Sequence, residues 1–179
     1  FLPLSKFVNK ALAPLPYKPI ISQIIDSIPI QARIHIVTGY LGNDLKFVVN
    51  SFHSDRDIVF HENTDYKYNG MGDSLLLALK AISSSPVVVL PNDGIYKNLS
   101  QIIELDTGKS PISIGYSKSQ VKNIEDYLCM SISEDGYLRS YLRGNHVFNK
   151  KLKHDCIFTG LMIINDTKLY QENLLSSFG

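Results

Sequence analysis

The sequence predicts an α/β domain of three layers, in which helices cover a mixed, mostly parallel sheet of the Rossmann-like type. Stretches with apolar residues at helical spacing alternate with short stretches rich in isoleucine and valine, which is typical of parallel strands joined by helices. Residues 86–90 form an uninterrupted apolar run, which indicates a strand buried on both faces of a sheet.

Each element has its own local signal. The expected helices carry apolar residues three and four positions apart, and they cover residues 20–28, 45–52, 75–82, 99–105 and 166–174. The expected strands are short and apolar, and they cover residues 34–38, 57–60, 86–90, 112–114, 127–133, 137–142 and 156–165. Asn43 or Asp44 can cap the second helix, Asp73 or Ser74 opens the third, and Asp166 can cap the last.

The pattern changes after Ser110. Glu134-Asp135-Gly136 lies between two expected strands and has the composition of a hairpin turn. We therefore expect an antiparallel addition to the parallel sheet. No stretch has the composition of a linker, so residues 1–179 are expected to belong to one domain.

Composition limits the classes of function. The chain has 179 residues, of which 44% are hydrophobic and 20% charged, as in an ordinary globular domain. The net charge of +1 argues against a nucleic-acid surface, and no apolar run is long enough for a membrane span. Cys129 and Cys156 are far apart and predict two buried free thiols, in keeping with the cytoplasm. Homo-oligomerisation stays open.

Residues 1–16 alternate Pro, Ser, Asn and Lys with apolar anchors, which predicts an ordered loop before the first helix. Lys10 lies in this loop. A lysine ammonium beside a helix start suits a phosphate-bearing ligand, because it acts as a compact point charge. Taken alone, the pattern favours a solvated connection stiffened by proline over that interpretation.

Asp93 lies in the turn Asn92-Asp93-Gly94, directly after the most buried of the expected strands. In open α/β sheets, ligands collect beyond the carboxyl ends of the strands. A lone carboxylate there suits a magnesium ion that also binds substrate phosphates. The same turn is equally consistent with a helix cap or an Asx turn.

Two segments that contain glycine could also meet a ligand. Gly70 and Gly72 precede an expected helix, where the backbone can approach an anion, although a plain helix start capped by Asp73 explains them too. Gly160 lies inside an expected strand and marks either the close approach of another group or a bulge. The five histidines have no metal-ligand spacing, and His35 is expected to be a core histidine with a partner for its ring.

Residues 3–14 resemble the second half of the signature of the nucleotide-sugar pyrophosphorylases, the sugar-phosphate nucleotidyltransferase family, which reads G-x-G-[ST]-R-x-x-P-L-[ST]-x-x-x-P-K-x-L-x-P. Pro-Leu-Ser at residues 3–5 looks like P-L-[ST], and Lys-Ala-Leu-Ala-Pro at residues 10–14 looks like K-x-L-x-P, whereas Asn9 replaces the usual proline. The glycine-rich half and its strand are missing from the sequence. A parallel sheet without that strand would expose an edge in its middle, so we expect the domain to continue beyond both ends.

Three further segments resemble motifs of this family, in the same order along the chain. Asn92-Asp93 looks like the strand-end [GN]-D motif, whose aspartate binds the catalytic cation. Residues 70–75 look like the G-T-A-[DG]-A-[LIV] segment, which lies against the nucleobase. Residues 159–162 look like [NT]-[AT]-G-[IL]-[YM], which passes the sugar or alcohol half of the substrate.

The resemblance implies the nucleotide-diphospho-sugar transferase fold and a magnesium-dependent nucleotidyltransferase of the EC 2.7.7 type. A sugar 1-phosphate or phosphocholine-like acceptor would attack a nucleoside triphosphate and give an NDP-activated compound and pyrophosphate, for a surface polysaccharide such as a capsule. Lys10 would be catalytic, Asp93 would bind Mg²⁺, and Gly70, Asn92 and Gly160 would bind substrate.

Other interpretations stay open. A second metal-binding aspartate, which the family places late in the chain, has no clear counterpart before Gly179. A glycosyltransferase that uses a nucleotide sugar normally shows D-x-D, and residues 92–94 lack one of its carboxylates. A non-catalytic regulatory domain that binds a nucleotide is the third interpretation. Neither the base nor the acceptor can be read from the sequence.

Overall fold

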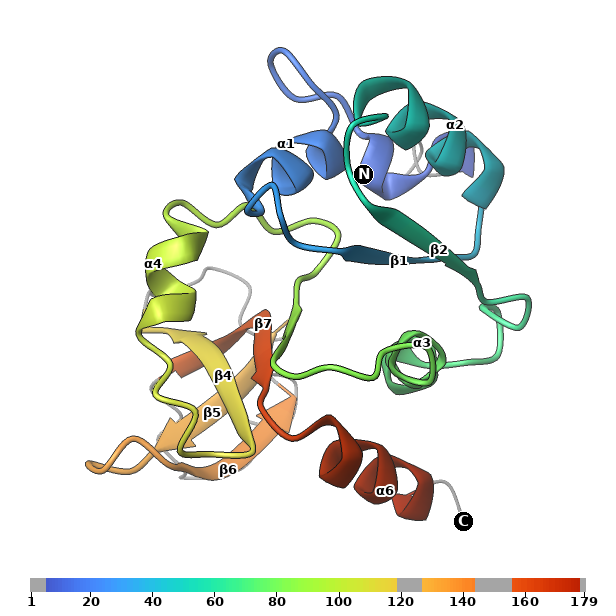
Figure 1. Ribbon diagram of the computed structural model, residues 1–179. Helices are drawn as coiled ribbons and strands as arrows, with labels where there is room; N and C mark the ends of the chain where they lie inside the picture. Colours follow the sequence, from blue (N-terminus) through green and yellow to red (C-terminus); the bar gives the residue numbers. More distant parts are fainter. Residues whose placement is uncertain (1–5, 119–126, 144–155, 178–179) are drawn as a thin grey trace.

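The computed structural model describes residues 6–118, 127–143 and 156–177, and it confirms the mixed α/β class (Figure 1). Its helices are η2 (Lys10–Leu12, a single 3-10 turn), α1 (Ile20–Ser27), α2 (Gly42–Phe52), α3 (Met71–Leu79), α4 (Leu99–Glu104) and α6 (Thr167–Ser177). Its strands are β1 (Ile34–Thr38), β2 (Ile58–Glu62), β3 (Val87–Val89), β4 (Ile112–Ser117), β5 (Leu128–Ile132), β6 (Leu138–Arg143) and β7 (Cys156–Ile164).

Strands β1 and β2 form a parallel pair that is covered by helices on both faces. Alternate residues of β1 are buried, as the two-residue period of a strand requires, and Ile34 and Ile36 belong to one cluster with Ile25 of α1 and Val49 of α2. Helix α3 contacts β1 and lies on the side of the strand pair opposite α1 and α2 (Figure 1). This part of the chain therefore has the three predicted layers.

Strand β7 is the centre of a five-stranded sheet whose pairings are antiparallel. It pairs with β3, β4 and β5, and β6 pairs with β5. The predicted antiparallel strands after Ser110 and the hairpin at residues 134–136 are thereby confirmed, although among the described residues these strands form a sheet with β3 and not with the parallel β1–β2 pair. Gly136 takes the positive φ of 84° that the hairpin turn needs. Cys129 and Cys156 are buried free thiols, as predicted.

The predicted cap of α2 is wrong. The helix begins at Gly42, before Asn43 and Asp44, and no side chain caps it. The reason is a tight turn after β1, in which the N–H of Gly42 donates to the carbonyl of Gly39 at 3.0 Å. Leu41 takes a left-handed conformation with φ of 51° in this turn, which brings the chain directly into the helix.

The predicted starts of α3 and α6 agree with the structure to different degrees. Helix α3 begins at Met71, so the prediction that Asp73 or Ser74 opens it is wrong. The carboxylate of Asp73 accepts a hydrogen bond from the N–H of Gly70 at 2.8 Å and stabilises the helix start from within the first turn. At α6 the prediction is confirmed, because the carboxylate of Asp166 accepts from the N–H of Leu169 at 2.9 Å.

The β1–β2 pair and the five-stranded sheet share no strand within the described ranges. Side chains connect them instead: Leu90, just after β3, packs against Ile20 and Ile24 of α1, and Gln171 of α6 donates to the carbonyl of Leu79 in α3 at 2.7 Å. None of the helices in these ranges has the length and apolar character that crossing a membrane requires. That residues 1–179 belong to one domain stays a prediction.

His35 of β1 lies beside His61 of β2, which supplies the predicted partner for its ring. The two rings stack with centroids 5.1 Å apart, and Nδ1 of His35 lies 2.8 Å from Nε2 of His61. His35 is half-buried. Burial lowers its pKa most, the charges of His61 and Arg33 lower it further, and Asp57 opposes them.

We predict that this histidine makes folding less favourable in acid. Because the pKa of His35 lies below its ordinary value of 6.5 in the folded state, the unfolded chain takes up the proton first as the pH falls. Its contribution to stability is complete above pH 6.5 and is lost below that value. His53 acts in the same direction, because burial lowers its pKa as well.

The measurement is thermal unfolding at about pH 7.5 and about pH 5.5, on either side of the ordinary pKa. Between these two pH values, we expect the melting temperature of the wild type to fall by more than that of His35→Gln. The melting temperature of the variant should still fall, in part because His53 is protonated as well. Equal losses in the two proteins would contradict the role of His35.

Candidate functional site

Three loops meet beyond the carboxyl ends of β1 and β2. The side-chain amide of Asn9 donates to the carbonyl of Tyr40 at 2.7 Å, and the hydroxyl of Tyr40 donates to the carbonyl of Lys6 at 2.6 Å. The ring of Tyr66 lies 6.3 Å from that of Tyr40, and a Cβ on Gly39 would lie 2.7 Å from that of Tyr66. The loops before α1, after β1 and after β2 therefore form one connected surface.

Lys10 belongs to the short helix η2, which is fixed on both sides. Ala11 and Ala13 are buried, and the side chain of Asn9 accepts a hydrogen bond from the N–H of Ala11 at 3.0 Å. Asn9 replaces the proline of the family signature, and here it both caps η2 and holds Tyr40. The sequence did not reveal this double role. The backbone of Lys10 is therefore held in place, and its side chain extends toward solvent.

The ammonium of Lys10 forms an ion pair with the carboxylate of Asp93. The two residues are 83 positions apart in the sequence. The exposed fractions of their side chains are 46% and 41%, so both groups are open to a ligand from solvent. The structure thus brings together the residues that the sequence proposed as catalytic cation and as metal ligand.

Gly160 lies next to the turn that carries Asn92 and Asp93. It has a φ of 87°, and a Cβ at this position would lie 2.8 Å from Cγ of Pro91. Both interpretations of this glycine are correct: β7 shifts register against β4 here, and the group that approaches closely is Pro91. Asn92 is exposed. Whether Gly160 and Asn92 touch a substrate stays a prediction.

Gly70 occupies a different place. It precedes α3, and its N–H is already taken by Asp73. The hydroxyl of Ser74 bridges the carbonyl of Gly70 and the side-chain amide of Asn63 at 3.4 and 3.0 Å. Within the described part of the chain, no hydrogen bond or ion pair joins Gly70 to Lys10 or Asp93. Its role at the nucleobase also stays a prediction.

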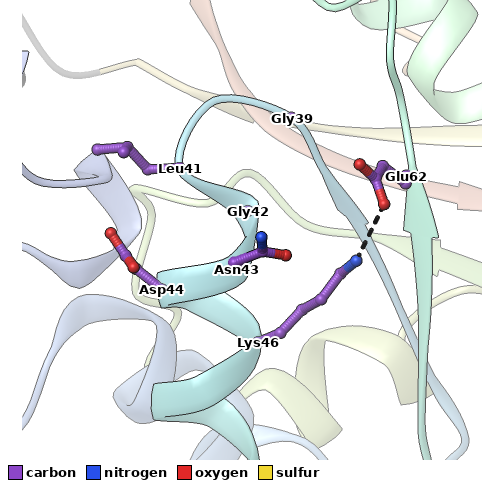
Figure 2. Close-up of a pocket in the computed structure, with 7 residues that line it drawn as sticks. All are labelled: Gly39, Leu41, Gly42, Asn43, Asp44, Lys46 and Glu62. Atoms are coloured by element: carbon purple, nitrogen blue, oxygen red, sulfur yellow. Dashed lines mark hydrogen bonds and ion pairs between the residues drawn. The ribbon is translucent and has the colours of Figure 1, made fainter.

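A pocket of about 320 Å³ opens at the carboxyl ends of β1 and β2 (Figure 2). Its lining includes the glycines of the turn after β1 and a pair of opposite charges, Lys46 and Glu62, whose atoms Nζ and Oε2 lie 3.2 Å apart. Ligands of α/β proteins collect at this edge of the sheet. The sequence reasoning missed this pocket; the signal for it was Gly39 directly after an apolar strand.

The donor set at Asp93 fits a magnesium ion that takes most of its ligands from water or substrate, and not an ion enclosed by protein side chains. In residues 6–118, 127–143 and 156–177, no three His, Cys, Asp or Glu side chains are grouped so that they could hold a metal ion. Asp93 is a single, half-exposed carboxylate. Mg²⁺ commonly takes one or two carboxylates and completes its octahedral shell with water and substrate phosphates.

Known structures share this fold. HddC from Yersinia pseudotuberculosis, solved with GMP-PN, matches with 17% identity and a TM-score of 0.70, over 92% of this chain and 70% of HddC. An apo UDP-glucose pyrophosphorylase matches with 16% identity and a TM-score of 0.70, over 98% of this chain and 75% of the other. The inositol-1-phosphate CTP transferase of T. maritima matches with 14% identity and a TM-score of 0.69, over 88% of this chain and 62% of the other.

No protein-family model matches the sequence, and no curated protein matches it. At these low identities the structural likeness shows the fold. Two of these neighbours are a UDP-glucose pyrophosphorylase and an inositol-1-phosphate CTP transferase, and the fold that the sequence resemblance implied is confirmed.

We predict that Gly160→Ala is destabilising because of its neighbour Pro91. A Cβ 2.8 Å from Cγ of Pro91 cannot be accommodated without movement of the turn, which should cost about 1–3 kcal/mol. A positive φ costs a non-glycine residue about 1–2 kcal/mol more. Urea unfolding measures the sum.

Gly136→Ala is the matched control. Gly136 has a similar φ of 84°, but nothing lies within 4 Å of the added Cβ. This control should therefore show the cost of the backbone strain alone. Equal destabilisation in the two variants would mean that Pro91 does not press on Gly160.

Proposed function

We propose that the protein is a magnesium-dependent nucleotidyltransferase of the nucleotide-sugar pyrophosphorylase type. It would condense a nucleoside triphosphate with a phosphorylated acceptor, a sugar 1-phosphate or a phosphocholine-like compound, and release pyrophosphate. We place it in the cytoplasm, in the synthesis of a surface polysaccharide such as a capsule. The fold shared with UDP-glucose pyrophosphorylase and with inositol-1-phosphate CTP transferase supports the reaction class.

The observation that carries the proposal is the contact between Lys10 and Asp93. Each residue lies in a segment that resembles a different motif of this family. Their side chains form an ion pair, and Asp93 follows exposed Asn92 in the turn whose Pro91 packs against Gly160. A cation and a carboxylate at one edge of a sheet are what a polyanion and its divalent ion need.

Lys10 and Asp93 can each exchange the other for a ligand. Because both side chains are nearly half-exposed, water screens their attraction, and a pair of this kind contributes only about 0–1 kcal/mol. A triphosphate with its magnesium ion offers each group a more highly charged partner. Lys10 is then free to bind phosphate oxygens, and Asp93 to bind the divalent ion.

The roles of the residues are positioning and charge neutralisation. Bound Mg²⁺ would withdraw charge from the phosphates and reduce repulsion between two anionic reactants. Asp93 would hold the ion at the end of β3, and exposed Asn92 would contact the substrate. Lys10 would neutralise the phosphates and align them for in-line attack, a contribution that requires no covalent step by the protein.

The test is pyrophosphate release by the purified protein with CTP, UTP, dTTP, GTP and ATP, magnesium, and a panel of sugar 1-phosphates and phosphocholine. We expect release with at least one pair of substrates and none without magnesium. The same triphosphate should raise the melting temperature by mass action. A raised melting temperature without pyrophosphate release would point to a regulatory nucleotide-binding domain instead.

We predict that Lys10→Ala lowers turnover. Removal of a preorganised charge contact to the reacting phosphates should cost about 3 kcal/mol of transition-state stabilisation, or roughly 100-fold in kcat. Lys6→Ala is the control, since it removes an exposed residue of the same charge from the same loop. Unchanged turnover of Lys10→Ala, or equal losses in the two variants, would refute the role of Lys10.

A further inference from the structure

The turn that carries Asp93 is attached to β7 at both of its ends. It runs from Pro91 to Tyr96, directly after β3, and β7 is the strand with which β3 pairs. Asp93 lies between the two attachments. The place of its carboxylate therefore depends on what holds the turn.

The first attachment is a packing contact. The ring of Pro91 lies so close to Gly160 that a Cβ there would be 2.8 Å from Cγ of the proline. Inside the turn, a Cβ on Gly94 would lie 2.9 Å from the same Cγ and 3.3 Å from Cε2 of Tyr96. Pro91 and the ring of Tyr96 thus enclose Gly94 and leave the turn no room to contract.

The second attachment is a hydrogen bond. The hydroxyl of Tyr96 donates to the carbonyl of Thr159 in β7. This carbonyl lies in the stretch where β7 shifts register against β4, between the pairs Phe158–Tyr116 and Met162–Ile114. A bulged strand leaves backbone groups out of its ladder, so a side chain can bind one of them.

The hydroxyl of Tyr96 keeps the proton that it donates to Thr159. Burial raises the pKa of Tyr96, and the negative charge of Asp93 raises it further, against the hydrogen bond with Thr159. The phenol therefore stays protonated and keeps its hydrogen as a donor at neutral pH. Tyr96 thus binds the carbonyl of Thr159, whereas the carboxylate of Asp93 has Lys10 as its partner.

We propose that Tyr96 is a positioning residue: through its hydrogen bond to the Thr159 carbonyl, it holds the turn in the geometry in which Asp93 can bind a divalent cation. This inference rests on the proposed function, because it takes Asp93 as the cation ligand. Tyr96 itself acts through the backbone of the turn.

The experiment measures Mn²⁺ binding by electron paramagnetic resonance, with the metal alone as probe. Tyr96→Phe removes one oxygen and keeps the ring that encloses Gly94. We expect it to weaken Mn²⁺ binding about three- to tenfold, the range that one net hydrogen bond supplies. Tyr116→Phe is the matched control, because Tyr116 is a partly exposed tyrosine on β4 opposite Phe158, and it should leave binding unchanged.

Asp93→Asn separates this inference from the proposed function, and melting temperatures recorded alongside separate positioning from packing. If Asp93→Asn loses Mn²⁺ binding and Tyr96→Phe binds as the wild type does, the positioning role is overturned and the proposed function stands. A lower melting temperature of Tyr96→Phe with unchanged Mn²⁺ affinity overturns it too. If Asp93→Asn binds Mn²⁺ like the wild type, both the metal assignment and this inference fail.

Discussion

Leu90 packs against the cluster of Ala13, Ile20 and Ile24, and this apolar contact lies between the turn that carries Asp93 and the loop that carries Lys10. It joins the end of β3, which belongs to the five-stranded sheet, to the loop and helix that cover the β1–β2 pair. Leu90 is partly buried, so its packing contributes less than the roughly 1.5–3 kcal/mol of a fully buried leucine, and the half-exposed ion pair contributes about 0–1 kcal/mol. Packing at Leu90 therefore supports the approach of Asp93 to Lys10, and the attraction between the two exposed groups adds little to it.

The small contribution of the Lys10–Asp93 ion pair matters for function. A strong pair between Lys10 and Asp93 would compete with any ligand, because binding would first have to separate it. A weak pair on a firmly packed frame keeps both groups in place and leaves them available. The frame on the Lys10 side consists of buried Ala11 and of Asn9, whose side chain both caps η2 and binds the loop after β1.

Strand β7 holds the turn that carries Asp93. Its register shift opposite β4 lets Gly160 receive Pro91, and it offers the carbonyl of Thr159 to Tyr96. Gly115 of β4 lies opposite this stretch, and a Cβ there would be 2.6 Å from Oγ1 of Thr159, so glycine suits the facing position as well. A local irregularity in one strand thus shapes the turn that carries the proposed metal ligand.

The sequence by itself determined the elements. Apolar spacing in α1 and β1, the hairpin turn at Gly136 and the cap at Asp166 depend on neighbours a few residues away, and these were predicted correctly. The start of α2 was missed because a tight turn at Gly39 overrode the capping preference of Asn43 and Asp44.

Only the tertiary structure decided which groups meet. Lys10 and Asp93 are 83 residues apart, and the sequence suggested that they converge only through resemblance to a family. It did not indicate that the close neighbour of Gly160 is Pro91, that Asn9 holds Tyr40, or that Tyr96 binds Thr159. Contacts of this kind depend on how layers pack and where a strand bulges. Those are properties of the whole chain, so no local pattern of residues contains them.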